Sequence, residues 1–236
     1  MIRVLRAARQ SAVKARSQAA NQLQALRVTA PEKLQRRLCG LSTKELVATA
    51  ARFRPGNDPD GVETATRFAL RSMARQHEAL SEEIAELDAQ LDRLVAEVAP
   101  GLISLPAIST HHAATLLVVA GDNPERLGSE ASFASLCGVS PVDASSGKVV
   151  RHRLNRGGNR DANRALHMIC VVRMGSDRRT RSYVARRTAE GKSKREIMRC
   201  LKRYIAWEVY RIMFSSVTVE PPPIGITNRV VGAKIG

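Results

Sequence analysis

Aromatic residues, long apolar runs and paired cysteines are all scarce in this 236-residue chain. No apolar run approaches the roughly 18 residues that a membrane-spanning helix needs, so we expect no membrane span. The four cysteines contain no C-x-x-C pair, which argues against a zinc site or a disulfide framework and fits a reducing cytoplasm. Aromatic residues make up only 3% of the chain, but the hydrophobic share of 44% suffices for a packed core and argues against global disorder.

Positive charge is abundant and unevenly distributed, with a formal net charge of +16. Residues 1–50 hold 10 basic and 2 acidic side chains, residues 51–147 hold 7 and 14, and residues 148–211 hold 19 and 5. Such segregation points to nucleic acid first and to an anionic membrane surface second. The membrane is the weaker choice because neither basic block has an apolar face with aromatic anchors. Arginine-rich helices with solvated faces are the alternative explanation.

Helical patterns dominate, so the sequence predicts an all-α fold. Residues 2–29 contain good helix formers and no Gly or Pro. A short helix is expected between Pro31 and Gly40, and Ser42 with Glu45 predicts a capping box for a helix over 43–53. Further helices are expected at about 129–137, 160–175 and 191–214, with a loop that includes a short hairpin at 138–159.

The stretch 62–98 has no Gly or Pro and predicts one long helix. Its apolar residues recur at alternating steps of three and four, as in a coiled-coil seam, and His77 is the one polar member. The partner could be a helix of the same chain or of a second copy, and we expect a homo-oligomer through this seam. The seam consists of Leu70, Met73, His77, Leu80, Ile84, Leu87, Leu91, Leu94 and Val98.

The expected organisation is a helical segment at 1–61, the coiled-coil helix at 62–99, a helical domain at 100–214 and a disordered tail at 215–236. Within the helical domain, residues 102–121 have the pattern of a helix-hairpin-helix element. Its turn carries Ala107 and Ser109 where such elements use glycine to reach phosphate, so direct phosphate binding by this turn is doubtful. His111 and His112 are expected to cap the helix that follows the turn.

Three aromatic residues of the basic C-terminal helix, Tyr204, Trp207 and Tyr210, are expected to pack in the core. Cys137 and Cys170 have the character of small buried residues.

Residues 133–166 carry the groups from which chemistry can be built. Ser145 and Ser146 are followed at once by Gly147 and Lys148, and then by a cluster of arginines. A serine hydroxyl is a weak nucleophile that needs a base or nearby cations, and phosphoryl transfer depends mainly on such charge stabilisation. The segment therefore suits attack on a phosphodiester. A loop that only contacts phosphate is the alternative.

Four motifs in this order resemble one family: LCGVSP (136–141), SSGK (145–148), RLNRGGNR (153–160) and NRALH (163–167). The chain is similar to the C-terminal transposase domain of bacterial insertion-sequence families 110, 116 and 902. The match continues through Tyr183, EGK (190–192) and CLKRY (200–204), and covers about residues 1–214.

The resemblance implies an oligomeric DNA recombinase guided by a structured RNA, with a RuvC-like domain, a coiled coil and a serine-bearing domain. It implies that Ser146, or alternatively Ser145, is the nucleophile. It also implies contacts to DNA phosphates, or to the reacting group, by basic and amide side chains. These are Lys148, Arg151, Arg153, Arg156, Asn159, Arg160 and Arg164.

The chain departs from the family because the acidic residues that would hold Mg²⁺ in the RuvC-like domain are not found in it. We therefore expect no metal site and no cofactor here, with Mg²⁺ bound only by that missing domain. The expectation is a truncated transposase that binds DNA and guide RNA but is inactive alone, so whether it acts as an enzyme by itself is open. The alternative is a non-catalytic, coiled-coil dimerisation protein that binds nucleic acid, as a remnant or inhibitor of the intact transposase. Either protein would be cytoplasmic and associated with the bacterial nucleoid.

Overall fold

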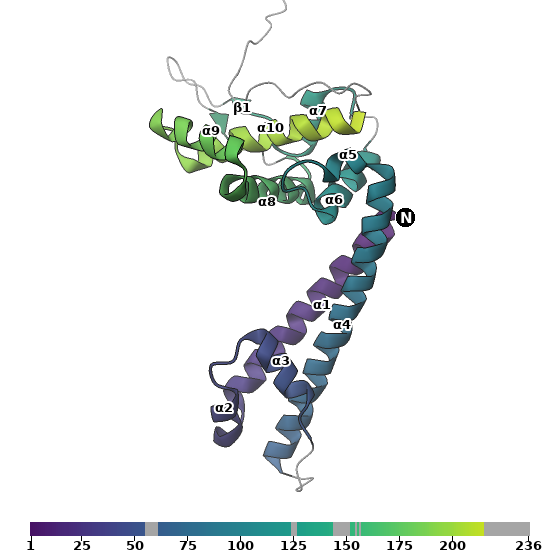
Figure 1. Ribbon diagram of the computed structural model, residues 1–236, viewed down its shortest axis with the longest axis vertical. Coiled ribbons are helices and arrows are strands. Elements are labelled where there is room, and N and C mark those ends of the chain that lie inside the picture. The colour runs from purple at the N-terminus through teal and green to yellow at the C-terminus, as the bar shows by residue number, and fades with distance from the viewer. Residues whose placement is uncertain (55–60, 124–126, 144–151, 154, 156, 215–236) are drawn as a thin grey trace, which may run out of the picture. The chain divides into compact units, whose positions relative to one another are not determined.

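The computed structural model is all-α, which confirms the expected fold class (Figure 1). It describes residues 1–54, 61–123, 127–143, 152–153, 155 and 157–214. The chain divides into two compact units, Met1–Arg93 and Leu94–Gly236. None of the described helices is long and apolar enough to cross a bilayer. The expected disordered tail at 215–236 lies outside the described residues.

The first unit contains α1 (Ile2–Thr29), α2 (Glu32–Leu38), α3 (Thr43–Ala51) and most of α4 (Val62–Val98). Helix α3 begins with the capping box expected from the sequence, because Ser42 Oγ accepts from the Glu45 amide and the Glu45 carboxylate accepts from the Ser42 amide. Such a box satisfies two amides that would otherwise lack partners at the helix start. Gly40, with φ of +75°, lies just after α2.

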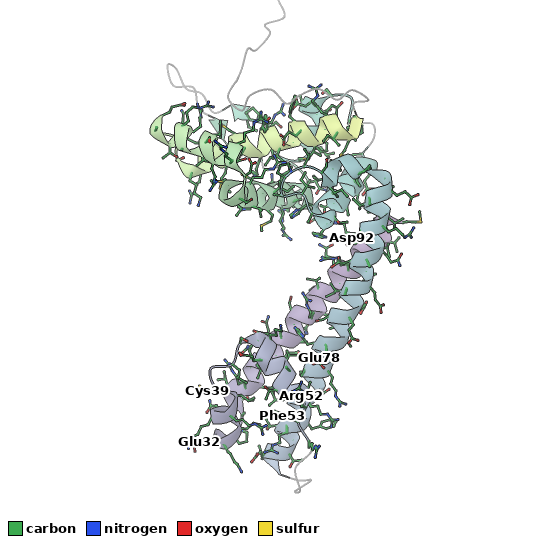
Figure 2. All side chains as sticks on the ribbon, in the orientation of Figure 1. Glu32, Cys39, Arg52, Phe53, Glu78 and Asp92 are labelled. Carbon is green, nitrogen blue, oxygen red and sulfur yellow. The ribbon has the colours of Figure 1, made fainter. Side chains whose placement is uncertain are left out.

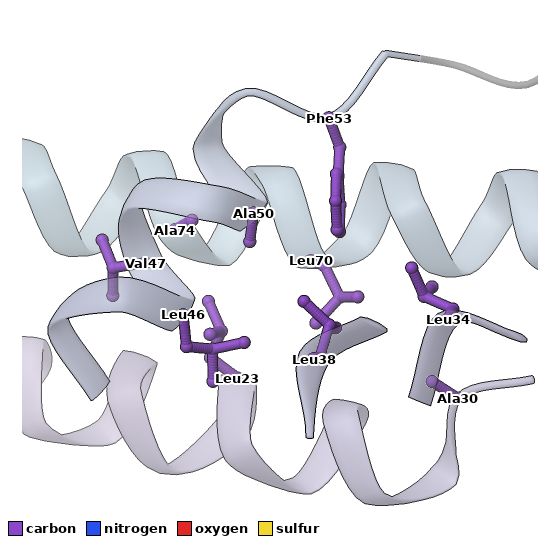
Figure 3. Packing of buried hydrophobic residues seen from close by; sticks show 10 residues of the cluster. All are labelled: Leu23, Ala30, Leu34, Leu38, Leu46, Val47, Ala50, Phe53, Leu70 and Ala74. Carbon is purple, nitrogen blue, oxygen red and sulfur yellow. The ribbon is translucent and has the colours of Figure 1, made fainter. Parts of the chain in front are cut away.

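The core of this unit gathers apolar side chains from all four helices (Figure 3). Leu23 of α1, Leu46 of α3 and Leu70 of α4 are fully buried in one cluster, together with Leu34 and Leu38 of α2. Burying a leucine side chain stabilises a fold by about 1.5–3 kcal/mol. The short helices α2 and α3 are therefore held by tertiary packing rather than by their own propensity.

The seam of α4 finds a helical partner within the same chain. Leu23 of α1 shares a core cluster with Leu70, while Arg9, two turns from the start of α1, pairs with Asp88 further along α4. The two helices therefore run antiparallel, as Figure 1 shows. Oligomerisation through the seam stays a prediction, and Val98 at its C-terminal end is exposed. Glu78 and Asp92 lie off the seam and are exposed (Figure 2).

His77, the polar seam position, is half-buried and has a lowered pKa. Burial lowers it most and the charge of Arg16 on α1 adds to this, while Glu78 opposes. The unfolded chain, with a histidine pKa of about 6.5, therefore binds a proton more readily than the folded chain. The free energy of unfolding is therefore not reduced by His77 above about pH 6.5. It falls as the pH drops towards the pKa of His77 in the folded chain.

Replacing His77 with leucine should stabilise the first unit by about 1 kcal/mol near pH 8, because an apolar side chain fills the seam. The gain should be larger near pH 5, where the wild-type histidine favours the unfolded chain. Urea unfolding of both proteins at the two pH values measures this. His77→Gln, which does not titrate, should lose the pH dependence without the apolar gain. An equal His77→Leu gain at both pH values would contradict the lowered pKa.

The second unit contains the C-terminal end of α4 and six helices: α5 (Pro100–Ile103), α6 (Thr110–Gly121), α7 (Glu130–Leu136), α8 (Arg160–Ser176), α9 (Arg178–Ala189) and α10 (Lys194–Phe214). Helix α10 packs against α7 and α8, and α6 also packs against α8. Fully buried residues such as Phe133, Leu166 and Ile197 fill these contacts. Strands β1 (Val142–Asp143) and β2 (His152–Arg153) form a short antiparallel pair, as the expected hairpin required.

Helix α9 was not expected from the sequence. Its arginine-rich stretch has no apolar stripe, and only Thr180 and Tyr183 are buried. The helix begins at a side-chain cap, in which the carboxylate of Asp177 accepts from the Thr180 amide at 2.7 Å. The cap and the contacts with α8 and α10 thus determine a helix that hydrophobic periodicity does not reveal.

Candidate nucleic-acid interface

Two family-like motifs meet at a contact between glycines, which we call the glycine junction (Gly138 and Gly158). A Cβ on Gly158 would lie 2.1 Å from the Gly138 nitrogen and 2.3 Å from its Cα. Gly138 itself has φ of +66°, a left-handed conformation that favours glycine. The backbones of the two motifs can approach this closely because Gly158 has no side chain.

Asn163 on α8 ties the motif of Gly138 to α8 and α10 by side-chain hydrogen bonds. Its Nδ2 donates to the carbonyls of Cys137 and Gly138, both at 3.0 Å. Its Oδ1 accepts from Nζ of Lys202 on α10, also at 3.0 Å. Lys202 is only 7% exposed, and burial lowers its pKa. One asparagine therefore connects the loop after α7 with both α8 and α10.

Asn159 begins α8, and two exposed arginines follow it. The Asn159 Oδ1 accepts from the amides of Asp161 and Ala162, each at 3.0 Å, so a phosphate contact by this side chain would use Nδ2. Arg160 and Arg164 are exposed and lie one helical turn apart on the same face. The start of α8, next to the glycine junction, therefore presents the guanidinium groups of Arg160 and Arg164 to solvent.

Several expected site residues lie outside the described residues: Ser145, Ser146, Lys148, Arg151 and Arg156. Arg153 is described only as backbone in β2, where it pairs with Val142. The β1–β2 pairing brings Asp143 next to His152. Next to the glycine junction, the Asn159 amide donates to the Leu136 carbonyl at 2.7 Å.

The two buried cysteines next to this site are not candidate nucleophiles. Burial raises the pKa of Cys137 to about 12 and that of Cys170 to about 11. Both thiols therefore stay protonated at neutral pH, whereas the thiolate is the reactive form. Both side chains are fully buried, as the sequence predicted.

The turn between α5 and α6 differs in one detail from the expectation. Ser109, not a histidine, caps α6 by accepting from the His112 amide, and the His112 ring Nδ1 lies 3.1 Å from the Ser109 Oγ. Ala107 takes φ of +61°, a conformation usually left to glycine. The buried Arg173 of α8 donates to the Pro106 carbonyl at 2.8 Å, which fixes the turn against α8.

In the part of the chain that the structure describes, no three His, Cys, Asp or Glu residues come together in a way that could hold a metal ion.

The motifs that meet here lie in a segment that is similar to a known family. Residues 99–185 match the model of the family described as Transposase IS116/IS110/IS902. This segment is similar to an insertion-sequence transposase domain. It includes the glycine junction, Asn159, Asn163 and both exposed arginines.

A curated relative supports the same similarity. The protein named Insertion element IS110 uncharacterized 43.6 kDa protein, from Streptomyces coelicolor (strain ATCC BAA-471 / A3(2) / M145), is 33% identical over 139 residues, which is 58% of this chain. The matched region covers 34% of the length of that relative.

The sequence alone missed Lys202 as part of this site, although CLKRY was among the quoted motifs. A buried lysine on the apolar side of a helix, next to Leu201 and Ile205, is the available signal, because lysine is seldom buried without a partner. Asn163 was likewise quoted in a motif without an assigned role. Its three hydrogen bonds become visible only once α8, α10 and the loop after α7 are packed.

Proposed function

We propose that this chain takes part in DNA transposition as the portion of an insertion-sequence transposase that grips nucleic-acid phosphates next to the reacting serine. The observation that supports it best is the glycine junction, where separate motifs of the family-like segment meet beside Arg160 and Arg164. A structured guide RNA and association with nucleoid DNA are part of this proposal.

Each described residue has a distinct task in this proposal. Arg160 and Arg164 pair with phosphates from the face of α8 that is open to solvent. Asn163 and Lys202 hold the loop after α7 against α8 and do not touch DNA. The β1–β2 pair joins Asp143 and His152, the described residues that flank the serine segment in the sequence. Positioning and fixed positive charge are what phosphoryl transfer needs most from a protein.

The proposed chemistry is a transesterification at Ser146, with Ser145 as the alternative nucleophile. The serine oxygen loses its proton and forms a bond to phosphorus, while one bond from phosphorus to a deoxyribose oxygen breaks. That oxygen leaves as a hydroxyl and carries the proton equivalent. The product is a DNA chain linked to serine by a phosphodiester, and attack by a second deoxyribose hydroxyl releases the serine. The number of phosphodiester bonds is unchanged, so no energy source is needed.

A second function is favoured by the exposed charge on α9. Arg178, Arg179 and Arg181 are all exposed there, and binding nucleic acid through them requires no chemistry. In this alternative the chain is a non-catalytic nucleic-acid-binding and dimerisation protein that interferes with an intact transposase.

The test separates the two functions by a covalent adduct. The chain is incubated with guide RNA, DNA spanning the ends of the element, and a RuvC-like domain of the same family supplied in trans. An adduct that survives denaturant in the wild type and disappears in Ser146→Ala, while Ser145→Ala retains it, supports the transposase proposal. Loss in Ser145→Ala alone moves the nucleophile to Ser145.

Binding without any adduct under these conditions favours the non-catalytic function, and absence of nucleic-acid binding contradicts both.

Arg160→Ala/Arg164→Ala is the matched variant for the grip on phosphate. It should lower the slope of log affinity against log salt by about 2, since each phosphate contact contributes about 0.9. Lys33→Ala/Lys44→Ala, which removes two exposed charges from the first unit, is the control.

A further inference from the structure

A row of rings and guanidinium groups joins α9 to α10; we call it the stacked row (Arg179, Tyr204, Trp207 and Arg211). The Tyr204 and Trp207 rings are stacked, with centroids 5.8 Å apart and planes inclined by 26°. The Arg211 guanidinium lies 5.0 Å from the Trp207 ring centroid, and that of Arg179 lies 5.9 Å from the Tyr204 centroid. The two rings therefore lie next to each other, with one guanidinium group at each end of the row.

The helical positions of the row keep it at the surface of α10. Tyr204, Trp207 and Arg211 are spaced by three and four residues, so they share one side of the helix. The buried side is formed by other residues, among them Leu201 and Ile205. Both rings remain half-buried, whereas Phe133 in the core is fully buried.

This placement differs from the expectation that Tyr204, Trp207 and Tyr210 all pack in the core. Tyr210 comes nearest to it: its ring lies 5.9 Å from that of Phe133, and its hydroxyl donates to the Leu127 carbonyl at 3.3 Å. The Tyr204 and Trp207 rings instead stack on each other. All three side chains are half-buried, so none of them is a fully buried core residue.

The surroundings of the row suit an anion. Residues 148–211 hold 19 basic side chains and 5 acidic ones, and Arg178 and Arg181 are exposed on α9. The carboxylate of Glu208 interacts with Tyr204, and it is itself paired with Arg173 at 2.5 Å. Phosphates could therefore approach the rings without meeting an uncompensated negative charge.

We propose that unpaired bases of a single-stranded nucleic acid stack on Trp207 and Tyr204, while Arg179 and Arg211 pair with the flanking phosphates. Bases stack readily on aromatic side chains, and arginine adds both charge and a planar surface. Duplex DNA cannot use this row, because its bases are already stacked on one another. The inference rests on the proposed function and adds to it a specific site for single strands.

The single tryptophan makes the proposal directly measurable. Trp207 is the only Trp of the chain, so its fluorescence reports on this row alone. Titration of the full chain with (dT)20 or (rU)20 should quench the fluorescence as anisotropy shows binding. A 20-base-pair duplex and heparin should bind with little quenching. Stronger quenching by one of the two single strands identifies DNA or RNA as the preferred source of the bases.

Variants separate stacking from charge. Trp207→Leu keeps an apolar side chain and should lower the affinity for single strands about tenfold, with duplex affinity unchanged. Trp207→Phe, which keeps a ring, should recover most of the loss. Arg211→Ala should weaken binding of single strands more than Arg195→Ala, which removes an exposed charge from α10 away from the row.

The outcomes also separate this inference from the proposed function. Binding of single strands without quenching, or equal losses of single-strand and duplex affinity in Trp207→Leu, would overturn the stacking site and leave the grip at Arg160 and Arg164 intact. Absence of binding to every nucleic acid would overturn both proposals together.

Discussion

Gly158→Ala should destabilise the second unit by about 3 kcal/mol or more, the upper range for an overpacked site. The new Cβ would lie 2.1 Å from the nitrogen of Gly138, 2.3 Å from its Cα and 2.8 Å from the Cys137 carbonyl carbon. All three atoms belong to the backbone, so no side chain can rotate out of the way. The loop after α7 or the start of α8 must move, and the Asn163 hydrogen bonds to Cys137 and Gly138 would break with that movement.

The neighbouring glycine provides the matched control for this variant. A Cβ on Gly157 would come no closer than 3.5 Å to Oδ1 of Asn155, an ordinary contact. Thermal unfolding should therefore give a midpoint for Gly157→Ala close to wild type and one for Gly158→Ala lower by about 10 °C. The close contact between the two motifs would be disproved if both variants melted within a degree or two of each other.

Glu208→Ala should cost about 3–5 kcal/mol of stability, because it leaves a buried cation without its partner. The Arg173 side chain is 5% exposed and that of Glu208 is 11% exposed, and the two are joined at 2.5 Å. Arg173 also donates to the Pro106 carbonyl, but its buried Nη2 has no hydrogen-bond partner. Few acceptors are therefore at hand to compensate the charge once the carboxylate is removed.

A double variant distinguishes the unpaired charge from lost packing. Arg173→Met/Glu208→Leu removes both charges and keeps apolar volume, so its unfolding free energy should lie closer to wild type than that of Glu208→Ala alone. Glu190→Ala breaks exposed ion pairs with Arg186 and Arg187 and should cost no more than about 1 kcal/mol. Urea unfolding of all three compares them. A double variant less stable than Glu208→Ala would show that the ion pair itself stabilises the fold.

The sequence predicted those elements whose signals are local. The capping box at Ser42 and Glu45, the apolar period of α4 and the breaker-free stretch of α1 act over a few residues or along one helix, and all three appear in the structure. Helix α9 was missed because its signal is a single cap at Asp177, and its arginine-rich surface has no apolar period. The cap of α6 was assigned to the histidines. The structure shows that Ser109, which precedes them and has a short side chain ending in a hydroxyl, caps the helix.

The candidate site was predictable in part, since the motifs that resemble the family indicated Asn159, Arg160 and Arg164 by residue type and order. Their mutual geometry was not predictable. The glycine junction joins positions 20 residues apart in sequence, and Lys202 reaches Asn163 across 39. Neither contact is visible in the sequence as a periodic pattern, because such contacts depend on how whole helices pack.

By itself, the sequence determined the all-α class, the main helices and the concentration of positive charge in residues 148–211. Helix propensity, caps and charge are local properties, and each residue carries them wherever it lies. Tertiary structure alone decided that α1 packs along α4 in the antiparallel direction, that two glycines meet beside α8, and that the half-buried Trp207 stands with Tyr204 between two arginines. These arrangements follow from long-range packing, in which the position of one helix determines what the side chains of another can contact.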